Sequence, residues 1–314
     1  MLQLIIRRLF IMIPVLFLVS LMVFSMILLV PGDPAVTLAG ENATQEQIDA
    51  TRTRLGLDDP VIEQYGRWVG NAVQGDLGSS LFSSQKVTDA IVQRLPATLS
   101  LAGGGITLAV LIGIPAGILS AIFRGRWPDR TIQLGAASAL AMPNYFVAML
   151  LILFFAIWNR WLPATSYIPL SQDPWEWAKH LILPWITIGL ASAAVITRQL
   201  RSSLIGVLGQ DYVRTARAKG LRGRTVILKH ASKNAAIPVV TVLGTQIAFA
   251  LGGSVIVEQV FGIPGVGQLA INNVLKRDLP VIQGVVVMAT LLVLFCNLLV
   301  DLAYGYLNPK VRVR

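Results

Sequence analysis

The sequence is poor in the residues on which most soluble enzymes depend. It contains one cysteine and two histidines in 314 residues, and only 13% of its side chains are charged. A single thiol excludes an intrachain disulfide framework and any multi-cysteine metal site, and the distant His180 and His230 leave little material for a histidine cluster. By contrast, 54% of the residues are hydrophobic and the mean hydropathy is +0.67. These proportions indicate an integral membrane protein, because so few charges cannot cover a water-facing surface.

Six stretches are long and apolar enough to cross a bilayer. A spanning helix needs about 20 largely apolar residues, because every backbone amide must be paired inside the segment. The stretches run from Leu9 to Val30, Thr98 to Phe123, Ile132 to Trp158, Leu181 to Thr197, Ile237 to Val257 and Val281 to Tyr306. The sequence therefore predicts an all-α integral membrane protein with six transmembrane helices.

The first stretch follows Arg7 and Arg8, which is also typical of a cleavable signal peptide. Its apolar run is longer than the h-region of such a peptide, and no convincing small-x-small cleavage site follows it. We therefore expect an uncleaved anchor helix.

Lys and Arg are unevenly distributed between the two sides of these spans. If both termini are cytoplasmic, most of the 26 Lys and Arg residues fall in inner segments, above all in the segment after the fourth span. Short loops rich in these residues stay in the cytoplasm, so six spans with both termini inside agree with the charge asymmetry. A basic loop can also bind nucleic acid, but here a topology signal or a protein-docking surface explains it better, and we expect no nucleic-acid partner.

Residues 31–95, between the first two spans, are polar enough to form a small helical insert outside the membrane. Thr44 is a suitable N-cap for a helix from Gln45 to Leu55, and Gly56 suits its end.

A second helix of the insert is expected to start at Asp59 as N-cap, with Pro60 at the first helical position, and to close at Gly75. Its apolar residues recur at helical spacing: Ile62, Tyr65, Val69, Ala72 and Val73. We expect this face to pack on the outer ends of the spans. The alternative, which we favour less, is that the insert also forms part of a docking surface for an external partner, and the two interpretations are compatible.

The longest inner segment, residues 198–236, contains the pattern of a short helix. Asp211 is a good N-cap, Tyr212 to Lys219 make two helical turns, and Gly220 supplies the left-handed residue that ends them. A helix this short is not stable alone, so it must pack against something. Small and basic residues suit a polar or acidic cleft of a cytoplasmic partner, although an ordinary interfacial helix would explain them almost as well. These residues are Arg214, Thr215, Ala216, Arg217, Ala218 and Lys219.

Charged residues inside spans are costly and usually functional, which directs attention to Glu258 and Asp301. Glu258, at the outer end of the fifth span, either reaches the membrane interface, which we favour, or lies on a substrate path. Asp301, near the inner end of the sixth span, is expected to pair with an inner arginine.

Proline and glycine interrupt three spans, at Pro143-Asn144, at Pro184 and at Gly252-Gly253. Such breaks are tolerated where neighbouring helices or a water-filled cavity satisfy the freed backbone groups. They mark either a gate or, more simply at each position, kinked packing at small-residue interfaces. Cys296 is expected to be a small core residue.

Several motifs in order along the chain resemble one family. The run from Asp211 to Leu221, followed by His230 to Pro238, is similar to the EAA loop of permease subunits of binding-protein-dependent ABC importers. Further matches to the dipeptide, oligopeptide and nickel permeases are Pro31-Gly-Asp-Pro34, Leu55-Gly-Leu-Asp-Asp-Pro60, Gly75-Asp-Leu-Gly78, Leu95-Pro-Ala-Thr-Leu99, Phe261-Gly-Ile-Pro-Gly-Val-Gly267, Arg277-Asp-Leu-Pro-Val281, Asn297-Leu-Leu-Val-Asp301 and Asn308-Pro309. Asp211 stands where the EAA pattern often has Glu, a difference that matters little because either carboxylate caps a helix.

The resemblance implies a type I importer permease fold. Residues 1–30 would be the anchor helix, 31–95 the insert, 96–306 the ABC transmembrane domain with its coupling loop at 198–236, and 307–314 a cytoplasmic tail. Asp211 to Gly220 would be the coupling helix that seats in a separate ATPase. The implied location is the bacterial cytoplasmic membrane.

The same resemblance implies a set of partners: a second permease subunit, a homologue or another copy; two ATP-binding subunits; and an extracytoplasmic substrate-binding protein. No phosphate-loop pattern Gly-x-x-x-x-Gly-Lys-Ser/Thr occurs in the chain, so we expect ATP and Mg²⁺ to bind to the partner ATPases and no cofactor to bind here. The chain is thus expected to be a transport subunit and not an enzyme.

The resemblance also places a re-entrant turn at Phe261 to Gly267 near the translocation path. The candidates for the path or its gate are Pro143, Asn144, Glu258, Pro264, Gly265 and Gly267. Peptides are the expected cargo, and nickel complexes and glutathione are the alternatives within the family. A different class, an ATP-independent secondary transporter, remains open, although the spans lack the chain of buried ionisable residues expected of a proton-coupled carrier.

Overall fold

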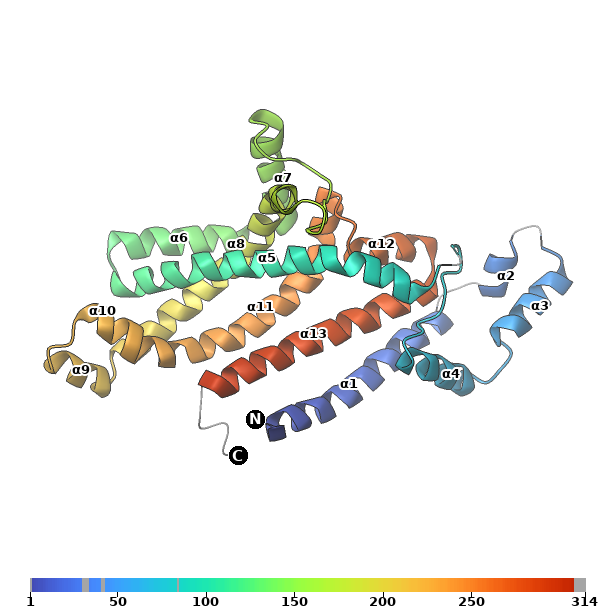
Figure 1. The fold of residues 1–314 in the computed structure, drawn as a ribbon, viewed down its shortest axis with the longest axis horizontal. Coiled ribbons are helices and arrows are strands. Elements are labelled where there is room, and N and C mark those ends of the chain that lie inside the picture. The colour runs from blue at the N-terminus through green and yellow to red at the C-terminus, as the bar shows by residue number, and fades with distance from the viewer. Residues whose placement is uncertain (1, 30–33, 41–42, 84, 308–314) are drawn as a thin grey trace. The chain divides into compact units, whose positions relative to one another are not determined.

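The computed structural model describes residues 2–29, 34–40, 43–83 and 85–307, and nearly all of these residues are helical. The helices in chain order are α1 (Leu2–Leu29), α2 (Pro34–Ala39), α3 (Gln45–Leu55), α4 (Val61–Val73), α5 (Val87–Ile122), α6 (Trp127–Ala141), α7 (Asn144–Leu151), the π-helix η1 (Ile152–Trp158), α8 (Pro174–Leu208), α9 (Asp211–Ala218), α10 (Gly223–Thr225), the π-helix η2 (Val226–Ala231), α11 (Ser232–Phe261), α12 (Val266–Lys276) and α13 (Leu279–Leu307). They are labelled in Figure 1.

The chain divides into two compact units, and each is described by itself. The first unit comprises Met1–Arg8, Pro96–Gly267 and Val293–Arg314, and the second comprises Leu9–Leu95 and Gln268–Leu292. Residues 31–33 of the expected insert and 308–314 of the expected tail lie outside the described residues.

The described helices confirm an all-α membrane protein. Five helical segments are long and apolar enough to cross a membrane, and the count rises to six if one bent pair forms a single span. The bent pair is α6 followed by α7 and η1, and the chain turns by 104° between its halves. Pro143 stands at this turn in an extended conformation, because it cannot donate the backbone hydrogen bond that would continue α6. The third predicted span is therefore broken and not one continuous helix (Figure 1).

Helix α8 is much longer than the fourth predicted span. Helix α8 starts after Asp173, whose carboxylate accepts hydrogen bonds from the backbone amides of Trp175 and Glu176, and it runs through Pro184 to Leu208. The predicted fourth span ended at Thr197 because Arg198 ends the apolar run, but a charged residue does not end a helix. The first part of the predicted inner loop is therefore the last part of α8.

Helices α5 and α8 lie parallel and very close in the first unit. A Cβ atom on Gly105, Gly113 or Gly117 would lie 2.9 Å from a side-chain carbon of Ile188, Ile196 or Leu200, respectively. The sequence separation is the same in all three pairs, so the helices run in the same direction in a fixed register. Small residues let membrane helices approach in this way, which strengthens their van der Waals packing.

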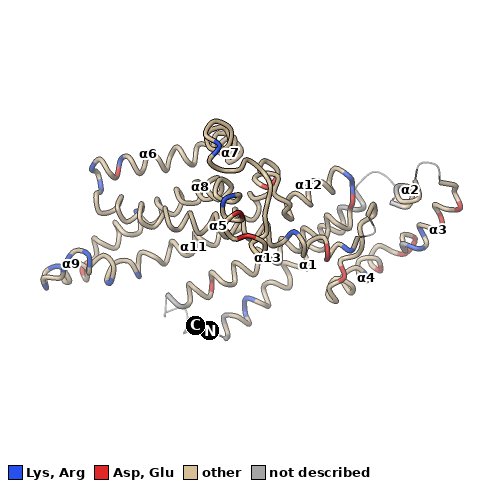
Figure 2. Tube along the Cα trace, turned by 45° about the horizontal axis from the view of Figure 1, so that its top comes forward, with Lys and Arg blue, Asp and Glu red and all other residues tan. Residues whose placement is uncertain are grey.

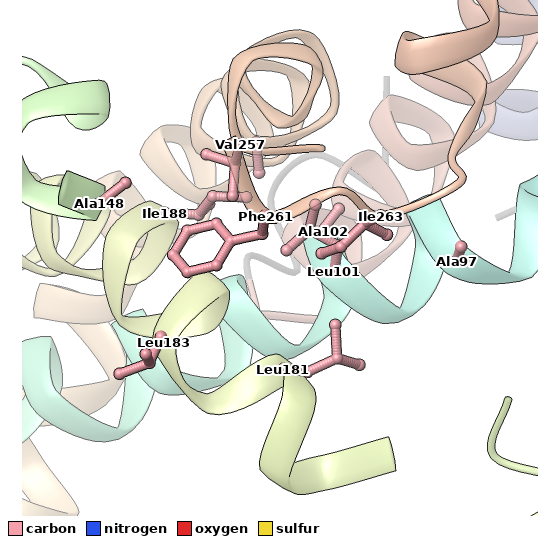
Figure 3. Close-up of a cluster of buried hydrophobic side chains, with 11 residues drawn as sticks. Ala97, Leu101, Ala102, Ala148, Leu181, Leu183, Ile188, Val257, Phe261 and Ile263 are labelled. Atoms are coloured by element: carbon pink, nitrogen blue, oxygen red, sulfur yellow. The ribbon is translucent and has the colours of Figure 1, made fainter. Parts of the chain in front are cut away.

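The apolar core of the first unit forms where α5, α7, α8 and α11 meet (Figure 3). Leu101 of α5, Leu181 and Leu183 of α8 and Phe261 of α11 are each less than 2% exposed. Trp185 joins the same packing and donates a hydrogen bond from Nε1 to the backbone oxygen of Ser100, 2.9 Å away. This core fixes the first halves of α5 and α8 and the end of α11 relative to one another.

In the second unit, the first helix of the insert forms as predicted. Thr44 caps α3 with a complete capping box together with Gln47, and Gly56 ends the helix in the left-handed conformation. The predicted cap of α4 is wrong by one residue, because Pro60 occupies the N-cap position and Asp59 forms an ion pair with Arg67 instead.

Helix α4 packs on α1 through aromatic residues. Tyr65 is buried, shares a 2.7 Å hydrogen bond with Ser20 and lies with its ring edge against Phe24. Ile62 and Val73 are 74% and 83% exposed, so the predicted apolar face is wrong at its two ends. The part of α4 that packs on the first span is therefore shorter than the run of apolar residues in its sequence suggested.

Candidate functional site

The short helix α9 folds back on the segments that flank it. Val213 is fully buried and Ala216 is 7% exposed, and both pack against Val226 of η2. Val207 and Leu208, at the end of α8, pack on the same cluster. This contact supplies the support that a helix of two turns lacks on its own, and it holds α9 firmly on the end of α8.

The start of α9 differs from the prediction, whereas its end agrees with it. Gln210 is the N-cap residue and Asp211 is the first helical residue, where its exposed carboxylate lies 3.3 Å from the Arg214 guanidinium. A carboxylate in the first turn of a helix still interacts favourably with the helix dipole. Gly220 has φ +78°, which confirms its predicted role as the left-handed residue that ends the helix.

The remaining side of α9 is exposed and basic. Its exposed residues are Asp211, Tyr212, Arg214, Thr215, Arg217 and Ala218, followed by Lys219 and Gly220. Lys and Arg gather around this end of the first unit (Figure 2). The hydroxyl of Tyr212 accepts a 2.8 Å hydrogen bond from the side-chain amide of Asn234 in α11. The helix is thus attached to both α8 and α11, and its cations point away from the chain.

A cavity of about 600 Å³ lies among α6, α7, α8 and α11 of the first unit. It brings Asn144 together with Gly252 and Gly253, three of the residues at which the sequence predicted interruptions. Pro143 does not line it. The described lining is neutral and offers amide and hydroxyl groups on apolar walls: Leu140, Asn144, Ile188, Ala191, Ser192, Val195, Thr245, Gln246, Ala248, Phe249, Ala250, Gly252 and Gly253.

Glu258 is fully buried, so the expectation that it reaches the membrane interface is wrong. The hydroxyl of Thr98 in α5 donates a 2.7 Å hydrogen bond to its carboxylate, and Ser254 donates a second of 3.3 Å. Thr98 also accepts a 2.8 Å hydrogen bond from the backbone amide of Val266. Glu258 thereby ties α5 and α11 to the turn before α12.

Gly265 and Gly267 are needed because other groups fill the space beside them. A Cβ atom on Gly265, in the turn, would overlap the Glu258 carboxyl group, and one on Gly267, in the first turn of α12, would lie 2.8 Å from the Val255 backbone and 2.9 Å from a carboxylate oxygen of Glu258. Pro264 is exposed. Sequence reasoning selected Glu258 and both glycines but missed Thr98, and it did not connect the carboxylate with the missing side chains opposite it.

Two ion pairs in the described part of the first unit join residues that lie far apart along the chain. Asp301 lies 2.9 Å from Arg8, which confirms the predicted pairing with an inner arginine. Asp129 and Arg201 form a second pair at 2.7 Å, which the sequence analysis did not predict. No group of three or more His, Cys, Asp or Glu suited to hold a metal ion occurs in the described part of the chain.

Two family models match most of the chain. Residues 113–313 match "binding-protein-dependent transport system inner membrane component", and residues 1–102 match the N-terminal part of the same kind of protein. The chain is 44% identical to the glutathione transport system permease protein GsiC of Escherichia coli and to that of Shigella dysenteriae. In both cases the match covers 100% of each chain.

Two solved structures share the fold at low sequence identity. One is the MetNI methionine ABC transporter in an inward-facing conformation, with a TM-score of 0.57 and 17% identity, covering 69% of this chain and 96% of the other. The second is an amino acid ABC transporter with histidines, with a TM-score of 0.53 and 16% identity, covering 70% of this chain and 94% of the other.

Proposed function

Since this chain belongs to the family of binding-protein-dependent transport system inner membrane components, we propose that its cargo is a short peptide. It is a permease subunit of an ABC importer with the type I fold. The observation that carries the cargo proposal is the 44% identity over the full length to permeases of glutathione transport systems, because glutathione is a tripeptide. Dipeptides and glutathione are therefore the first substrates to test.

The neutral cavity supports a peptide over a nickel complex. Its described lining contains no Asp, Glu, His or Cys, so it offers a metal ion none of its preferred charged or imidazole ligands. Asn144, Ser192 and Gln246 offer amide and hydroxyl groups that match the main chain of a peptide. We assign this cavity to the translocation path, with Asn144, Gly252 and Gly253 at its wall.

The candidate coupling helix is α9. Its support comes from geometry: it is anchored on α8 and α11, and it presents Arg214, Arg217 and Lys219 outward. In this proposal two ATPase subunits bind ATP and Mg²⁺ and accept α9 in an acidic or polar groove. A second, homologous permease completes the transmembrane part, and an external binding protein delivers the peptide. The proposed location is the bacterial cytoplasmic membrane with both termini inside.

The experiment is to purify the tagged chain from native membranes with its partners and reconstitute the complex in liposomes. ATP-dependent uptake of glutathione or alanyl-alanine is the expected result, and ATP-independent uptake by the chain alone would overturn the proposal. A nickel–histidine complex serves as the competing substrate.

The coupling assignment is tested with Arg217→Glu, which reverses an exposed charge of α9 without disturbing its buried side. Uptake should fall by about tenfold, the usual size of a lost coupling interaction. Arg124→Glu, an exposed residue between α5 and α6, is the matched control. Equal losses from both variants would remove α9 from its assigned role.

A further inference from the structure

We propose that the ion pair between Asp129 and Arg201 couples α6 to α8, so that a displacement of α9 moves the wall of the cavity. The inference rests on the proposed role of α9 as the contact with the ATPase. Asp129 and Arg201 are positioning residues in this scheme, because neither lies among the residues that line the cavity.

The pair has the geometry of a strong, directional contact. Arg201 Nε and Nη2 each donate a 2.7 Å hydrogen bond to a different oxygen of the Asp129 carboxylate. Asp129 is 3% exposed, and the Arg201 side chain is 27% exposed. Parallel bonds from a guanidinium to a carboxylate fix orientation as well as distance, and a lysine cannot reproduce them.

Further hydrogen bonds hold the carboxylate on the α5 side. Ser120 of α5 donates a 2.5 Å hydrogen bond to Asp129, and the backbone amide of Gly125 donates one of 2.8 Å. Gln133, one turn further along α6, donates a 3.0 Å hydrogen bond to the Ser120 hydroxyl. The ends of α5, α6 and α8 are therefore joined at one buried carboxylate.

The rest of the packing between α6 and α8 offers little resistance to sliding. Ala136 and Ala139 of α6 pack against Ala194, with Leu190 beside them. Alanine surfaces are smooth and allow a close approach, but they provide no side chain that locks the register. The ion pair between Asp129 and Arg201 adds a directional contact that fixes the position of α6 along α8.

Both ends of the connection are rigid. Arg201 precedes the end of α8 at Leu208 by about two helical turns, and Leu208 packs in the same buried cluster as Val213 of α9. At the other end, α6 stops at Ala141, and Leu140 and Asn144 on either side of this break line the cavity. A pull on α9 is thus transmitted along α8, across the ion pair and along α6 to the cavity wall.

The test uses the complete reconstituted complex and the ratio of peptide transported to ATP hydrolysed. Arg201→Lys keeps the positive charge but loses the paired hydrogen bonds, so the ratio should fall about tenfold while ATP hydrolysis stays within about twofold. Asp129→Asn should have the same effect. The double variant Asp129→Asn with Arg201→Lys should be no worse than either single variant, because all three remove one shared contact.

Arg8→Gln is the matched control, since it removes another ion pair of the same unit that is not part of this connection. Its ratio should remain that of the unaltered complex. The inference is overturned if Arg201→Lys keeps the normal ratio, or if transport and hydrolysis fall together in proportion. If the unaltered complex shows no ATP-driven uptake at all, the proposed function fails instead, so the two failures are distinguishable.

A second measurement reads the movement directly. Because Cys296 is the single cysteine, the variant Cys296→Ser with Asn144→Cys carries one thiol at the cavity. Its rate of modification by a maleimide should change when ATP binds, and Arg201→Lys should abolish this change. An unaltered nucleotide response in the Arg201→Lys protein would show that the cavity moves without the ion pair.

Discussion

Among the described residues of the first unit, two carboxylates are buried, Asp129 and Glu258, and their surroundings differ. Asp129 is held by the guanidinium of Arg201, a full opposite charge, whereas Glu258 accepts hydrogen bonds that include those from the neutral hydroxyls of Thr98 and Ser254. Room for Glu258 comes from the missing side chains of Gly265 and Gly267. The stability of buried Asp129 therefore depends mainly on the opposite charge of its partner, whereas that of buried Glu258 depends mainly on the shape of the space around it.

The largest loss of stability is expected at Glu258, where the shape of the surroundings matters most. Gly265→Ala places a methyl group on the Glu258 carboxyl group, and the backbone of the turn cannot move without breaking the bond between Val266 and Thr98. Overpacking of this kind costs about 3 kcal/mol, which should be measurable as a lower unfolding temperature in detergent.

A second substitution checks the reason for that loss. Glu258→Ala combined with Gly265→Ala restores the space, so the double variant should be more stable than the sum of the two single effects implies. Gly135→Ala is the control, because a Cβ atom there meets no atom within 4 Å. If Gly265→Ala is as well tolerated as Gly135→Ala, the packing explanation is wrong.

The next largest loss of stability is expected at Asp129, where the charge of the partner matters most. Asp129→Asn keeps the shape but leaves the Arg201 guanidinium without its counter-charge, and breaking a buried ion pair costs about 3–5 kcal/mol. Because the Arg201 side chain is 27% exposed, water recovers part of this cost, and we expect about 2 kcal/mol of lost unfolding free energy. Thermal unfolding in detergent is again the measurement, and no change in stability would contradict the proposed dependence on charge.

Glu258→Gln is the matching neutralisation in the other site, and it should be milder. The amide keeps an oxygen that accepts the hydrogen bond from Thr98, so the expected cost is about 1 kcal/mol, the size of one neutral hydrogen bond. A loss larger than that of Asp129→Asn would reverse the comparison and give Glu258 the more charge-dependent role.

The smallest effect is expected at the most exposed pair. Arg8→Gln removes a contact in which the arginine side chain is 49% exposed, and such pairs contribute about 0.5 kcal/mol. Raising the salt concentration should remove even this difference between Arg8→Gln and the unaltered protein. A stability loss near that of Asp129→Asn would mean that exposure does not govern the strength of these pairs.

The sequence predicts the spans better than it predicts their limits or their polar contacts. Apolar runs locate the membrane helices. The predicted fourth span ended before Arg198, because a charged residue lowers the hydropathy of the segment. Helix α8 nevertheless continues to Leu208, because a charged side chain does not interrupt the backbone hydrogen bonds of a helix. Pro143 correctly indicated an interruption, yet the angle of 104° depends on packing that no local pattern contains.

The polar contacts were harder for a related reason. An arginine partner for Asp301 was predictable, because several arginines flank the predicted spans on the side where Asp301 was expected, and the structure pairs it with Arg8. The partners of Asp129 and Glu258 were not predictable. Arg201 comes close to Asp129, and Thr98 close to Glu258, only when the helices pack together. At α9, the sequence predicted Asp211 as the N-cap because aspartate is a better capping residue than glutamine. In the structure Gln210 is the N-cap, and Asp211 is the first residue of the helix.

The three glycines of α5 that receive Ile188, Ile196 and Leu200 have a kinematic consequence. Each of these side chains fits against a glycine, where no Cβ atom is present. If one helix shifted along the other by part of a turn, all three side chains would collide with residues that do carry a Cβ atom. Axial sliding is therefore removed as a degree of freedom of the α5–α8 pair. A rotation or tilt of one of these two helices is therefore expected to carry the other with it.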